Sequence, residues 1–486
     1  MAHSRQRVEP IRVDPNQILL DTPSGFDMRL FANEEVPIDR ASLAEAAAMS
    51  EIASTVSDLD QRGFFGEEGG EVMRAVFTPD FHKATGIPVG SVLETRGLIF
   101  PKAAGSDIGC GMRLIATDLS EDEFARIGPG LDVLLRHVLF EGGRNIPLHA
   151  GAREAILRDG VQGLRAPQGG GGIWDQITPA VIDAEVAACH GGGRWQTSDI
   201  WRFGDFVRGS GGVSRDSQSG SLSGGNHFLE IGVVDEVMDR GAGWSWGLKR
   251  GFVTIMVHNG SLGLGGMVAE HFMDRARAIQ PKDIAKPGHG FDPLPTAGPL
   301  AGEGWAYLNA MGLAANFAVV NRLMLGMMAI DALGRAAGRE IACRTVWDAA
   351  HNVVWPGQAR HIHRKGATPA YEGEPVIIPG SMGDFSFVMR GAGHDQGLMS
   401  APHGAGRMTR RGRTHAHAEA GMEKLRVVTP IDPRLVPQRI REEAARDLRE
   451  EAPSAYKPIL PVIATTVGAG LATPVARLRP LMTAKR

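Results

Sequence analysis

The chain has 486 residues, of which 43% are hydrophobic and 22% are charged, and its formal net charge is −3. This composition excludes a wholly disordered chain, a collagen-like fibre and a coiled coil, and the length allows two or three domains or one large one. The small net charge provides no overall attraction for nucleic acid, so a site for polyanions has to come from local clustering of lysine and arginine. Glycine occurs 64 times, about 13% of the chain against a usual ~7%, which favours a site built from tight turns.

The cysteine content and the N-terminal sequence predict a cytoplasmic protein. Three scattered cysteines are too few for a disulfide framework, which favours a reducing compartment. The opening residues, MAHSRQRVEP, contain no apolar stretch typical of a secretory signal. The longest apolar tract, residues 305–333, is interrupted by polar side chains, so we expect a buried helix and no membrane contact. These side chains are Asn309, Asn316, Asn321, Arg322 and Asp331.

Residues 1–70 are predicted to form a peripheral N-terminal segment that contains no catalytic motif. A helix is expected over residues 41–57, and the acidic, glycine-rich stretch GFFGEEGGE follows it. From Val76 onward, short β-like runs alternate with glycine-rich turns. These runs are SVLETRGLIF, RLIATDL, HFLEIGVV, FVTIMV, EPVIIPG and FSFVMRG.

Helical patterns fill the gaps between these runs, over residues 121–139, 305–336 and 437–451. Segments 163–174 and 191–225 are rich in glycine and are predicted to be long surface loops. Strands and helices follow one another without a regular βαβ rhythm. We therefore expect an α+β fold in which one main catalytic domain spans residues 71–486.

A candidate metal-binding turn lies in the segment GSDIGCGMR. Asp107 and Cys110 lie close together in it, and the neighbouring glycines allow a tight turn that points a carboxylate and a thiolate at one centre. The alternative is a buried cysteine beside a turn-forming aspartate, and this segment alone does not decide between the two. A metal site needs further ligands.

Three histidines beside strand ends or glycines are candidates for those ligands, namely His227, His258 and His351. Each of them alone is more typical of a structural histidine. If all three converge with Asp107 and Cys110, however, five donors exceed one four-coordinate site with an open position. Two metal ions that share a bridging thiolate are then the simplest arrangement, and paired metals suit phosphoryl chemistry.

A further histidine, His403, lies between small residues in the segment SAPHGAGRMTRRGR. A neutral imidazole can attack phosphorus and hold the phosphoryl group covalently, while guanidinium groups neutralise the phosphate oxygens. The alternative is a solvated basic turn, which this stretch alone favours. The arginines that follow His403 are Arg407, Arg410, Arg411 and Arg413.

Together these segments resemble the RtcB-type RNA ligase family, from roughly residue 75 onward. So many motifs in one order are far more specific than a single glycine pattern. The matching segments are PDFHKATGIPVGSV, SDIGCGMR, SGGNHFLEIG, HNGSLGLG, AMGLAANFAVVNR, AHNVV, HRKGATPA, VIIPGSMGDFSFVMRG, APHGAGRMTR and EAPSAYK, with Lys485 further on.

The resemblance implies a function for each matching residue, with His403 as the histidine that becomes linked to GMP. Asp80 matches an acidic residue important to the family, and Arg407 and Arg410 would hold RNA backbone phosphates. The ligands of two manganese ions would be Asp107, Cys110, His227, His258 and His351. The guanylate would be held by Asn226, Glu230, Ser381, Tyr456 and Lys485. Manganese comes from the resemblance, because mixed S, N and O donors equally suit zinc or cobalt.

The activity implied by the resemblance is ligation of RNA. Members of the family join an RNA end that carries a 3′-phosphate or 2′,3′-cyclic phosphate to a 5′-hydroxyl end, using GTP and manganese. Two alternatives stay open: a guanylyltransferase that acts on another phosphorylated nucleic-acid end, including DNA, and an RNA-end-binding protein without turnover. The motifs name neither the RNA substrate nor an activating protein partner.

Three positions depart from the family pattern. Leu262 stands where the HSGSRG pattern has arginine, Ala84 replaces a glycine near His82, and Arg486 stands where glycine is usual. None of the three is among the predicted metal ligands. We therefore expect these departures to affect the handling of RNA ends more than the activation of the nucleotide.

His227 and Glu230 raise a question of strand geometry. In a regular strand, residues three apart face opposite sides of the sheet. Because both side chains should lie near the nucleotide, we expect a bulge or an irregular strand start after Gly224 and Gly225.

Overall fold

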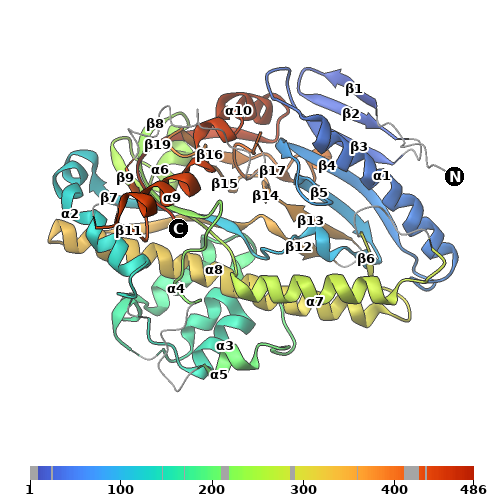
Figure 1. Cartoon of the computed structure of the whole chain (residues 1–486), viewed down its shortest axis with the longest axis horizontal. Coiled ribbons are helices and arrows are strands. Elements are labelled where there is room, and N and C mark those ends of the chain that lie inside the picture. Colours follow the sequence, from blue (N-terminus) through green and yellow to red (C-terminus); the bar gives the residue numbers. More distant parts are fainter. Residues whose placement is uncertain are drawn as a thin grey trace.

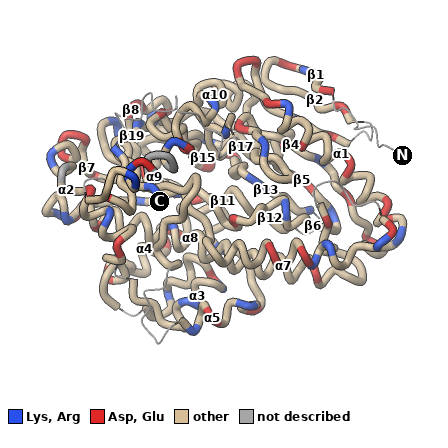
Figure 2. The backbone as a smooth tube through the Cα atoms, in the orientation of Figure 1, with Lys and Arg blue, Asp and Glu red and all other residues tan. Residues whose placement is uncertain are grey.

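The computed structural model describes residues 9–22, 26–144, 146–168, 170–209, 218–284, 291–357, 360–409, 426–432 and 435–486. These residues form an α+β fold, as predicted, in which two large sheets lie next to each other and helices cover them (Figure 1). Acidic and basic residues are interspersed along the chain, in keeping with the small net charge (Figure 2).

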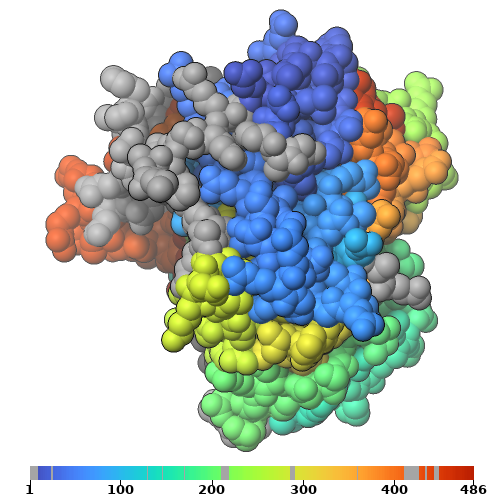
Figure 3. All heavy atoms as spheres, turned by 90° about the vertical axis from the view of Figure 1, so that its right-hand side faces the viewer, coloured from blue at the N-terminus to red at the C-terminus, as the bar shows by residue number. Residues whose placement is uncertain are grey.

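The first sheet has the strand order β1-β2-β3-β4-β5-β13-β12. β3 pairs in parallel with β4, so the N-terminal strands extend the sheet that carries β4 and β5. In Figure 3 the N-terminal residues (dark blue) lie directly against the next stretch of the chain (lighter blue). The predicted boundary between a peripheral N-terminal segment and the catalytic domain at residue 70 stays a prediction. The strands are β1 (Glu9–Asp14), β2 (Gln17–Asp21), β3 (Asp27–Phe31), β4 (Glu71–His82), β5 (Val89–Arg96), β13 (His361–Lys365) and β12 (Asn352–Pro356).

The second sheet has the order β11-β7-β9-β8-β19-β16-β15, and β18 (Val427–Val428) pairs with β19. Its strands are β11 (Cys343–Ala350), β7 (Gly111–Ser120), β9 (Phe252–Asn259), β8 (Phe228–Val237), β19 (Ala472–Ala484), β16 (Ser386–Gly391) and β15 (Pro375–Ile378). Two short pairs complete the described strands: β6 (Leu98–Ile99) with β10 (Leu294–Pro295), and β14 (Ala367–Pro369) with β17 (Ser400–Pro402).

The helices confirm the predicted helical segments. α1 (Arg40–Gln61) contains the range predicted near the N-terminus, α2 (Glu121–Leu139) has the predicted bounds, and α9 (Gln438–Arg449) lies within the range predicted for it. The side chains of Asp39 and Ser120 accept hydrogen bonds from the first turns of α1 and α2, which starts both helices where the sequence supplies a cap. The other helices are α3 (Ala150–Asp159), α4 (Pro179–Ala187), α5 (Gly204–Arg208), α6 (Arg240–Trp246), α7 (Gly263–Ile279), α8 (Ala301–Ala337) and α10 (Ile459–Gly468).

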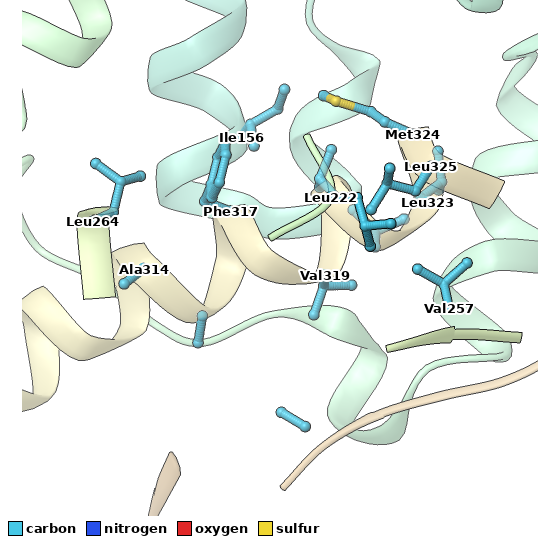
Figure 4. Close-up of a cluster of buried hydrophobic side chains, with 14 of the residues drawn as sticks. Ile156, Leu222, Val257, Leu264, Ala314, Phe317, Val319, Leu323, Met324 and Leu325 are labelled. Atoms are coloured by element: carbon cyan, nitrogen blue, oxygen red, sulfur yellow. The ribbon is translucent and has the colours of Figure 1, made fainter. Parts of the chain in front are cut away.

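Helix α8 is the centre of the largest hydrophobic core. It is long and apolar enough to cross a membrane, yet 94% of its most apolar window is buried inside the protein, which confirms the predicted buried helix. Figure 4 shows Phe317, Leu323 and Met324 of α8 among side chains from other elements, including Val257 of β9. Its polar residues therefore need partners inside the core.

The prediction of long surface loops was wrong in part. Within the described residues of 163–174 and 191–225, short 3-10 turns and α5 replace open loop, and Trp174, Trp195 and Phe203 are buried in the main core. These aromatic side chains remove enough apolar surface from water to fold glycine-rich chain against the protein. Residues 169 and 210–217 of these segments lie outside the described part of the chain.

Arg322 of α8 is fully buried and makes a connected set of hydrogen bonds. Its guanidinium donates to the carbonyl oxygens of Gly109 at 2.6 Å and Asn259 at 2.9 Å, and to the carboxylate of Asp348 at 2.6 Å. Asp348 also accepts from Arg113 at 2.9 Å, and Arg113 donates to Glu185 at 2.5 Å. This network ties α8 to loops and strands that are far apart in the sequence.

Replacing Arg322 should therefore destabilise the protein strongly. Arg322→Met keeps the side-chain length but leaves Asp348 short of a buried partner, and removing one member of a buried pair costs about 3–5 kcal/mol. We expect a loss of that order in the free energy of unfolding, measured by denaturant titration. The matched control is Arg335→Met on the exposed side of the same helix, where the pair with Asp331 spans 3.8 Å and should contribute under about 1 kcal/mol. Equal losses in the two variants would contradict this account of the network.

Candidate active site

The five predicted metal ligands gather at one edge of the second sheet. The strands that carry them are neighbours, in the order β11-β7-β9-β8. Cys110 directly precedes β7, His258 lies near the end of β9, His227 directly precedes β8, and His351 directly follows β11. Because these strands are antiparallel, the start of β7 and β8 and the end of β9 and β11 meet at the same edge.

Cys110 is the donor shared by two groups of ligand atoms. One group contains Cys110, His258 and His351, and the other contains Asp107, Cys110 and His227, with all atoms of each group within 4.8 Å of one another. The sulfur lies 3.2 Å from Nε2 of both His227 and His258. Nε2 of His227 lies 2.8 Å from the carboxylate of Asp107, and Nε2 of His258 lies 3.3 Å from Nε2 of His351.

The donor set fits a cation. Nδ1 of His258 contacts the carbonyl oxygen of Asn226 at 3.1 Å, so this nitrogen carries the proton and the Nε2 lone pair faces Cys110 and His351. Burial lowers the pKa of His258 and of His351 well below the usual value, which keeps both rings neutral. Burial also raises the pKa of the Cys110 thiol, so its thiolate form needs a positive charge nearby. Lone pairs turned toward one centre are stabilised when a metal ion lies between them.

The position of the Asp107 carboxylate depends on the absence of a side chain at Gly260. A Cβ atom on Gly260, two residues after His258, would lie 2.0 Å from Oδ1 of Asp107. Any side chain there would push the carboxylate away from His227. The glycine of the HNGSLGLG segment is therefore part of the geometry of the donor cluster.

His403 is held by a buried carboxylate from the first sheet. It directly follows β17, and its Nδ1 lies 2.5 Å from Oδ2 of Asp80 in β4, which also accepts from the His403 backbone N–H at 3.2 Å. Burial alone would raise the pKa of Asp80, but the charge and hydrogen bond of His403 and the bond from Thr78 outweigh it and lower that pKa. When Nδ1 donates its hydrogen bond to Asp80, the lone pair of the His403 ring is on Nε2 and is available as a nucleophile.

The His403 ring and the donor cluster are in contact. The ring centroids of His351 and His403 are 4.7 Å apart, and both residues line the same cavity of about 300 Å³. Of the residues singled out from the sequence, the others that line this cavity are Asp107, Cys110, Asn226, Glu230, His258, Ser381, Arg407, Tyr456 and Lys485. The structure thus brings together the predicted donors, the predicted nucleophile and the predicted guanylate residues.

The start of β8 explains how His227 and Glu230 serve one site. His227 precedes the first residue of the strand, and regular pairing with β9 begins only at Phe228. The expected irregular start after Gly225 is therefore confirmed. Glu230 is buried, and burial raises its pKa to about 8, with one weak hydrogen bond at 3.5 Å from Thr483 opposing the shift.

Lys485 and Ser381 are two further predicted residues that line the cavity. The Lys485 ammonium donates to the carbonyl oxygens of Gly225 at 2.7 Å and His227 at 3.2 Å, which fixes the turn before β8. Ser381 lies in the turn between β15 and β16 and is largely buried. Lys485 thus supports the donor His227 as well as lining the cavity.

Glu451 is a cavity residue that was not predicted from the sequence. It is buried and accepts hydrogen bonds from the Tyr456 hydroxyl and, at 3.1 Å, from Arg407. The carboxylate also lies 3.9 Å from the Lys485 ammonium. Its position as the first residue of the segment EAPSAYK could have indicated a function. However, the sequence does not show which of the adjacent residues Glu450 and Glu451 has the buried side chain.

Arg407 is engaged within the protein. Its guanidinium donates to Glu451 and to the Tyr456 hydroxyl at 3.1 Å and lies 5.0 Å from the Tyr456 ring centroid. It therefore supports one wall of the cavity in this structure, and its expected contact with an RNA phosphate stays a prediction. Arg410, predicted alongside it, lies outside the described residues.

Leu262, the residue directly before α7, has a backbone conformation that is unusual for a branched side chain. Its φ angle is 52°, and its side chain packs against the main hydrophobic core. Arg113, an alternative source of positive charge near the site, is buried and paired with Glu185 and Asp348. Its guanidinium therefore does not replace an arginine at position 262.

The Cys110→Ser variant should bind fewer metal ions than the parent protein. A hydroxyl is a poorer ligand for soft or borderline ions than a thiolate, and both donor groups contain this residue. We expect two metal ions per parent chain at saturation and one or none in the variant, measured by elemental analysis after manganese loading and desalting. Cys343→Ser, which changes an exposed cysteine outside the cluster, is the control and should bind as the parent does. Undiminished metal in Cys110→Ser would contradict the shared-donor geometry.

Residues 69–486 match the family described as tRNA-splicing ligase RtcB. The tRNA-splicing ligase RtcB of Thermococcus kodakarensis is 32% identical over 449 residues, which cover 85% of this chain and 87% of that protein. The RNA-splicing ligase RtcB of Mycobacterium tuberculosis is 31% identical over 444 residues, which cover 84% of this chain and 96% of that protein. The chain belongs to the RtcB family.

Proposed function

We propose that the protein is a GTP-dependent RNA ligase that joins ends bearing a 3′-phosphate or 2′,3′-cyclic phosphate to 5′-hydroxyl ends. The observation that carries this proposal is the position of His403, which is bonded through Nδ1 to Asp80 and lies beside the donor cluster in one cavity. Membership of the RtcB family supports the ligase activity. The cytoplasm is the compartment we propose for it, since reduced cysteines suit its donor set.

His403 would act as the nucleophile toward GTP. Its Nε2 attacks the α-phosphorus, the N–P bond forms, the bond to the bridging oxygen breaks and pyrophosphate leaves. The ring becomes positively charged in this step, and the Asp80 carboxylate on Nδ1 stabilises that charge. Because Asp80 is buried and held also by Thr78 at 2.5 Å, the ring is fixed before the nucleotide arrives.

Two transfers would then complete the ligation. An oxygen of the RNA 3′-phosphate attacks the phosphorus of the guanylate, and the N–P bond to His403 breaks. The 5′-hydroxyl oxygen next attacks the RNA 3′-phosphorus, a phosphodiester forms and GMP leaves. A cyclic phosphate end first has to be opened by water to the 3′-phosphate.

The cavity residues around His403 would hold the guanylate. Glu230 and Lys485 present a carboxyl group and an ammonium that suit the amino and carbonyl edge of guanine, and Tyr456 offers an aromatic wall. Asn226 and Ser381 add neutral hydrogen-bonding groups to the cavity wall. Burial of Glu230 makes this carboxyl group selective for a partner that can donate hydrogen bonds.

Two manganese ions would be held by Asp107, Cys110, His227, His258 and His351, with Cys110 contributing to both. When bound, the ions supply positive charge that neutralises phosphate oxygens in the cavity. The chain's own contribution is a donor set in which His258 and His351 are neutral and the His258 ring is oriented by the carbonyl oxygen of Asn226.

A guanylyltransferase that acts on another phosphorylated end, including DNA, is the second candidate. The observation that favours it is Leu262, where the resemblance leads one to expect a phosphate-binding arginine. The residues proposed for nucleotide activation are all present in the cavity. A protein that binds RNA ends without turnover is less well supported, because it would not need the Asp80–His403 pair.

The covalent intermediate provides the direct test of this function. Purified protein incubated with labelled GTP and manganese should carry a guanylate that is stable to alkali and lost in acid, as expected of a phosphoramidate. The readout is a denaturing gel. His403→Ala should abolish the label while metal content stays at the parent level. A His403→Ala protein that labels as well as the parent would show that another residue is the nucleophile.

Leu262 should separate the two halves of the reaction. A charge-assisted contact to phosphate is worth about 1.5–3 kcal/mol, so its absence should slow sealing of a 3′-phosphate/5′-hydroxyl RNA pair about tenfold or more. We expect rapid formation of the adduct and slow sealing by the parent, and faster sealing by Leu262→Arg without much change in adduct formation. Single-turnover measurements of both steps decide this. Brisk sealing by the parent would mean that Leu262 does not limit the function.

A further inference from the structure

Lys457 is a buried lysine to which neither the resemblance nor the proposed reaction assigns a function. Only 3% of its surface is exposed. Its ammonium donates to the carbonyl oxygen of Pro79 at 3.0 Å and to that of Phe81 at 2.6 Å. These two carbonyls stand on either side of Asp80, the residue that bonds His403. One ammonium thus bonds the carbonyl oxygens of the residues before and after Asp80 in β4.

The backbone of Lys457 is attached to the loop that carries His403. Its N–H donates to the carbonyl oxygen of Gly406 at 2.9 Å. That loop lies directly on β4, because a Cβ atom on Gly406 would be 2.2 Å from the carbonyl oxygen of Asp80. Lys457 therefore bonds the two segments that carry the Asp80–His403 pair: its side chain bonds β4 on either side of Asp80, and its main chain bonds the loop that follows His403.

The ammonium keeps its charge at this depth. Burial lowers the pKa of Lys457 to about 8, while Asp80 and Asp39 act in the opposite direction. A lysine with this pKa is mostly protonated at neutral pH and donates to acceptors that do not move. Buried cations are retained only where such acceptors surround them.

We propose that Lys457 is a positioning residue for the nucleophile, which holds β4 so that Asp80 stays on Nδ1 of His403 and leaves Nε2 available for attack on GTP. The inference rests on the proposed function of His403. Lys457 lines no part of the cavity, so its effect should fall on the rate of the chemical step and not on binding of the nucleotide. A misplacement of about 1 Å in such a pair can cost about a hundredfold in rate.

The test compares two lysine-to-methionine variants. Lys457→Met removes the ammonium and keeps the stem. Lys83→Met is the matched control, because Lys83 pairs with Glu45 at 2.8 Å near the same strand and contacts neither carbonyl beside Asp80. Three quantities are measured: the single-turnover rate of guanylylation at saturating GTP, the dissociation constant of a GTP analogue with an α,β-methylene bridge, and bound manganese.

We expect the guanylylation rate of Lys457→Met to fall about tenfold to a hundredfold, with analogue binding and metal content within a factor of about two of the parent. Lys83→Met should match the parent in all three. An unchanged rate in Lys457→Met would overturn the proposal. The proposal would also be overturned if the loss of rate were fully explained by a loss of bound metal, of analogue binding or of folded protein.

A double variant shows whether Lys457 acts through Asp80. If it does, Lys457→Met should cost little further rate in an Asp80→Asn background, because the bond that it protects is already gone. The same fold-loss in both backgrounds would overturn the proposed route. Should Lys457→Met fail to fold, Lys457→Arg keeps a cation for the two carbonyls and should retain most of the rate; a folded Lys457→Arg protein as slow as Asp80→Asn would contradict the proposal.

A measurement without GTP separates this inference from the proposed function. In metal-free protein labelled at histidine, the Nδ1 proton shared by His403 and Asp80 should give a downfield resonance that Asp80→Asn abolishes. Lys457→Met should shift or broaden it, and Lys83→Met should leave it in place. An unaltered resonance in Lys457→Met overturns the positioning role even if the parent forms the adduct. Absence of the adduct in the parent would reject the proposed function and leave this readout valid.

Discussion

The guanidinium of Arg322 bonds three segments that are far apart in the sequence, namely those that contain Gly109, Asn259 and Asp348. It donates to the carbonyl oxygens of Gly109 and Asn259, which directly neighbour Cys110 and His258, and to the carboxylate of Asp348, three residues before His351. A charge at zero exposure is expensive unless every donor is satisfied. The long apolar helix α8 carries Arg322 and keeps water away from its hydrogen bonds, which stabilises the network.

The two large sheets make different contributions to one cavity. The second sheet supplies the predicted metal donors at the meeting ends of four antiparallel strands, and the first supplies Asp80 from β4. His403 lies between them, with its ring against His351 on one side and its Nδ1 on Asp80 on the other. Phosphoryl transfer requires exact positions of the reacting groups and neutralisation of phosphate charge. The predicted nucleophile and the predicted metal donors thus come from different parts of the fold and meet in one cavity.

Much of the site could be predicted from residue types and motif order, because donors such as Asp107 and Cys110 are chemically distinctive and sit in glycine-rich turns. The buried helix was predictable for a similar reason: Arg322 and Asn321 within an apolar tract required partners inside the protein. The functions of Glu451 and Lys457 were not predictable, since each depends on contacts with residues tens to hundreds of positions away. The two segments that contain Trp174 and Trp195 were wrongly expected to be open loops. Their high glycine content suggested loops, whereas the apolar area that these tryptophans bury folds the segments against the core.

The place of β19 in the second sheet has a consequence for how the protein is made. β19 follows every other described strand in the chain, yet it lies in the middle of the sheet, hydrogen-bonded to β8 on one side and β16 on the other. During synthesis, the strands that carry Cys110, His258 and His351 emerge long before it. The edge of β8 beside Glu230 must stay open until residues 472–484 arrive, since Thr483 pairs opposite Glu230. Residues 472–484 therefore complete the pairing of β8 only after the strands beside Cys110, His258 and His351 have been synthesised.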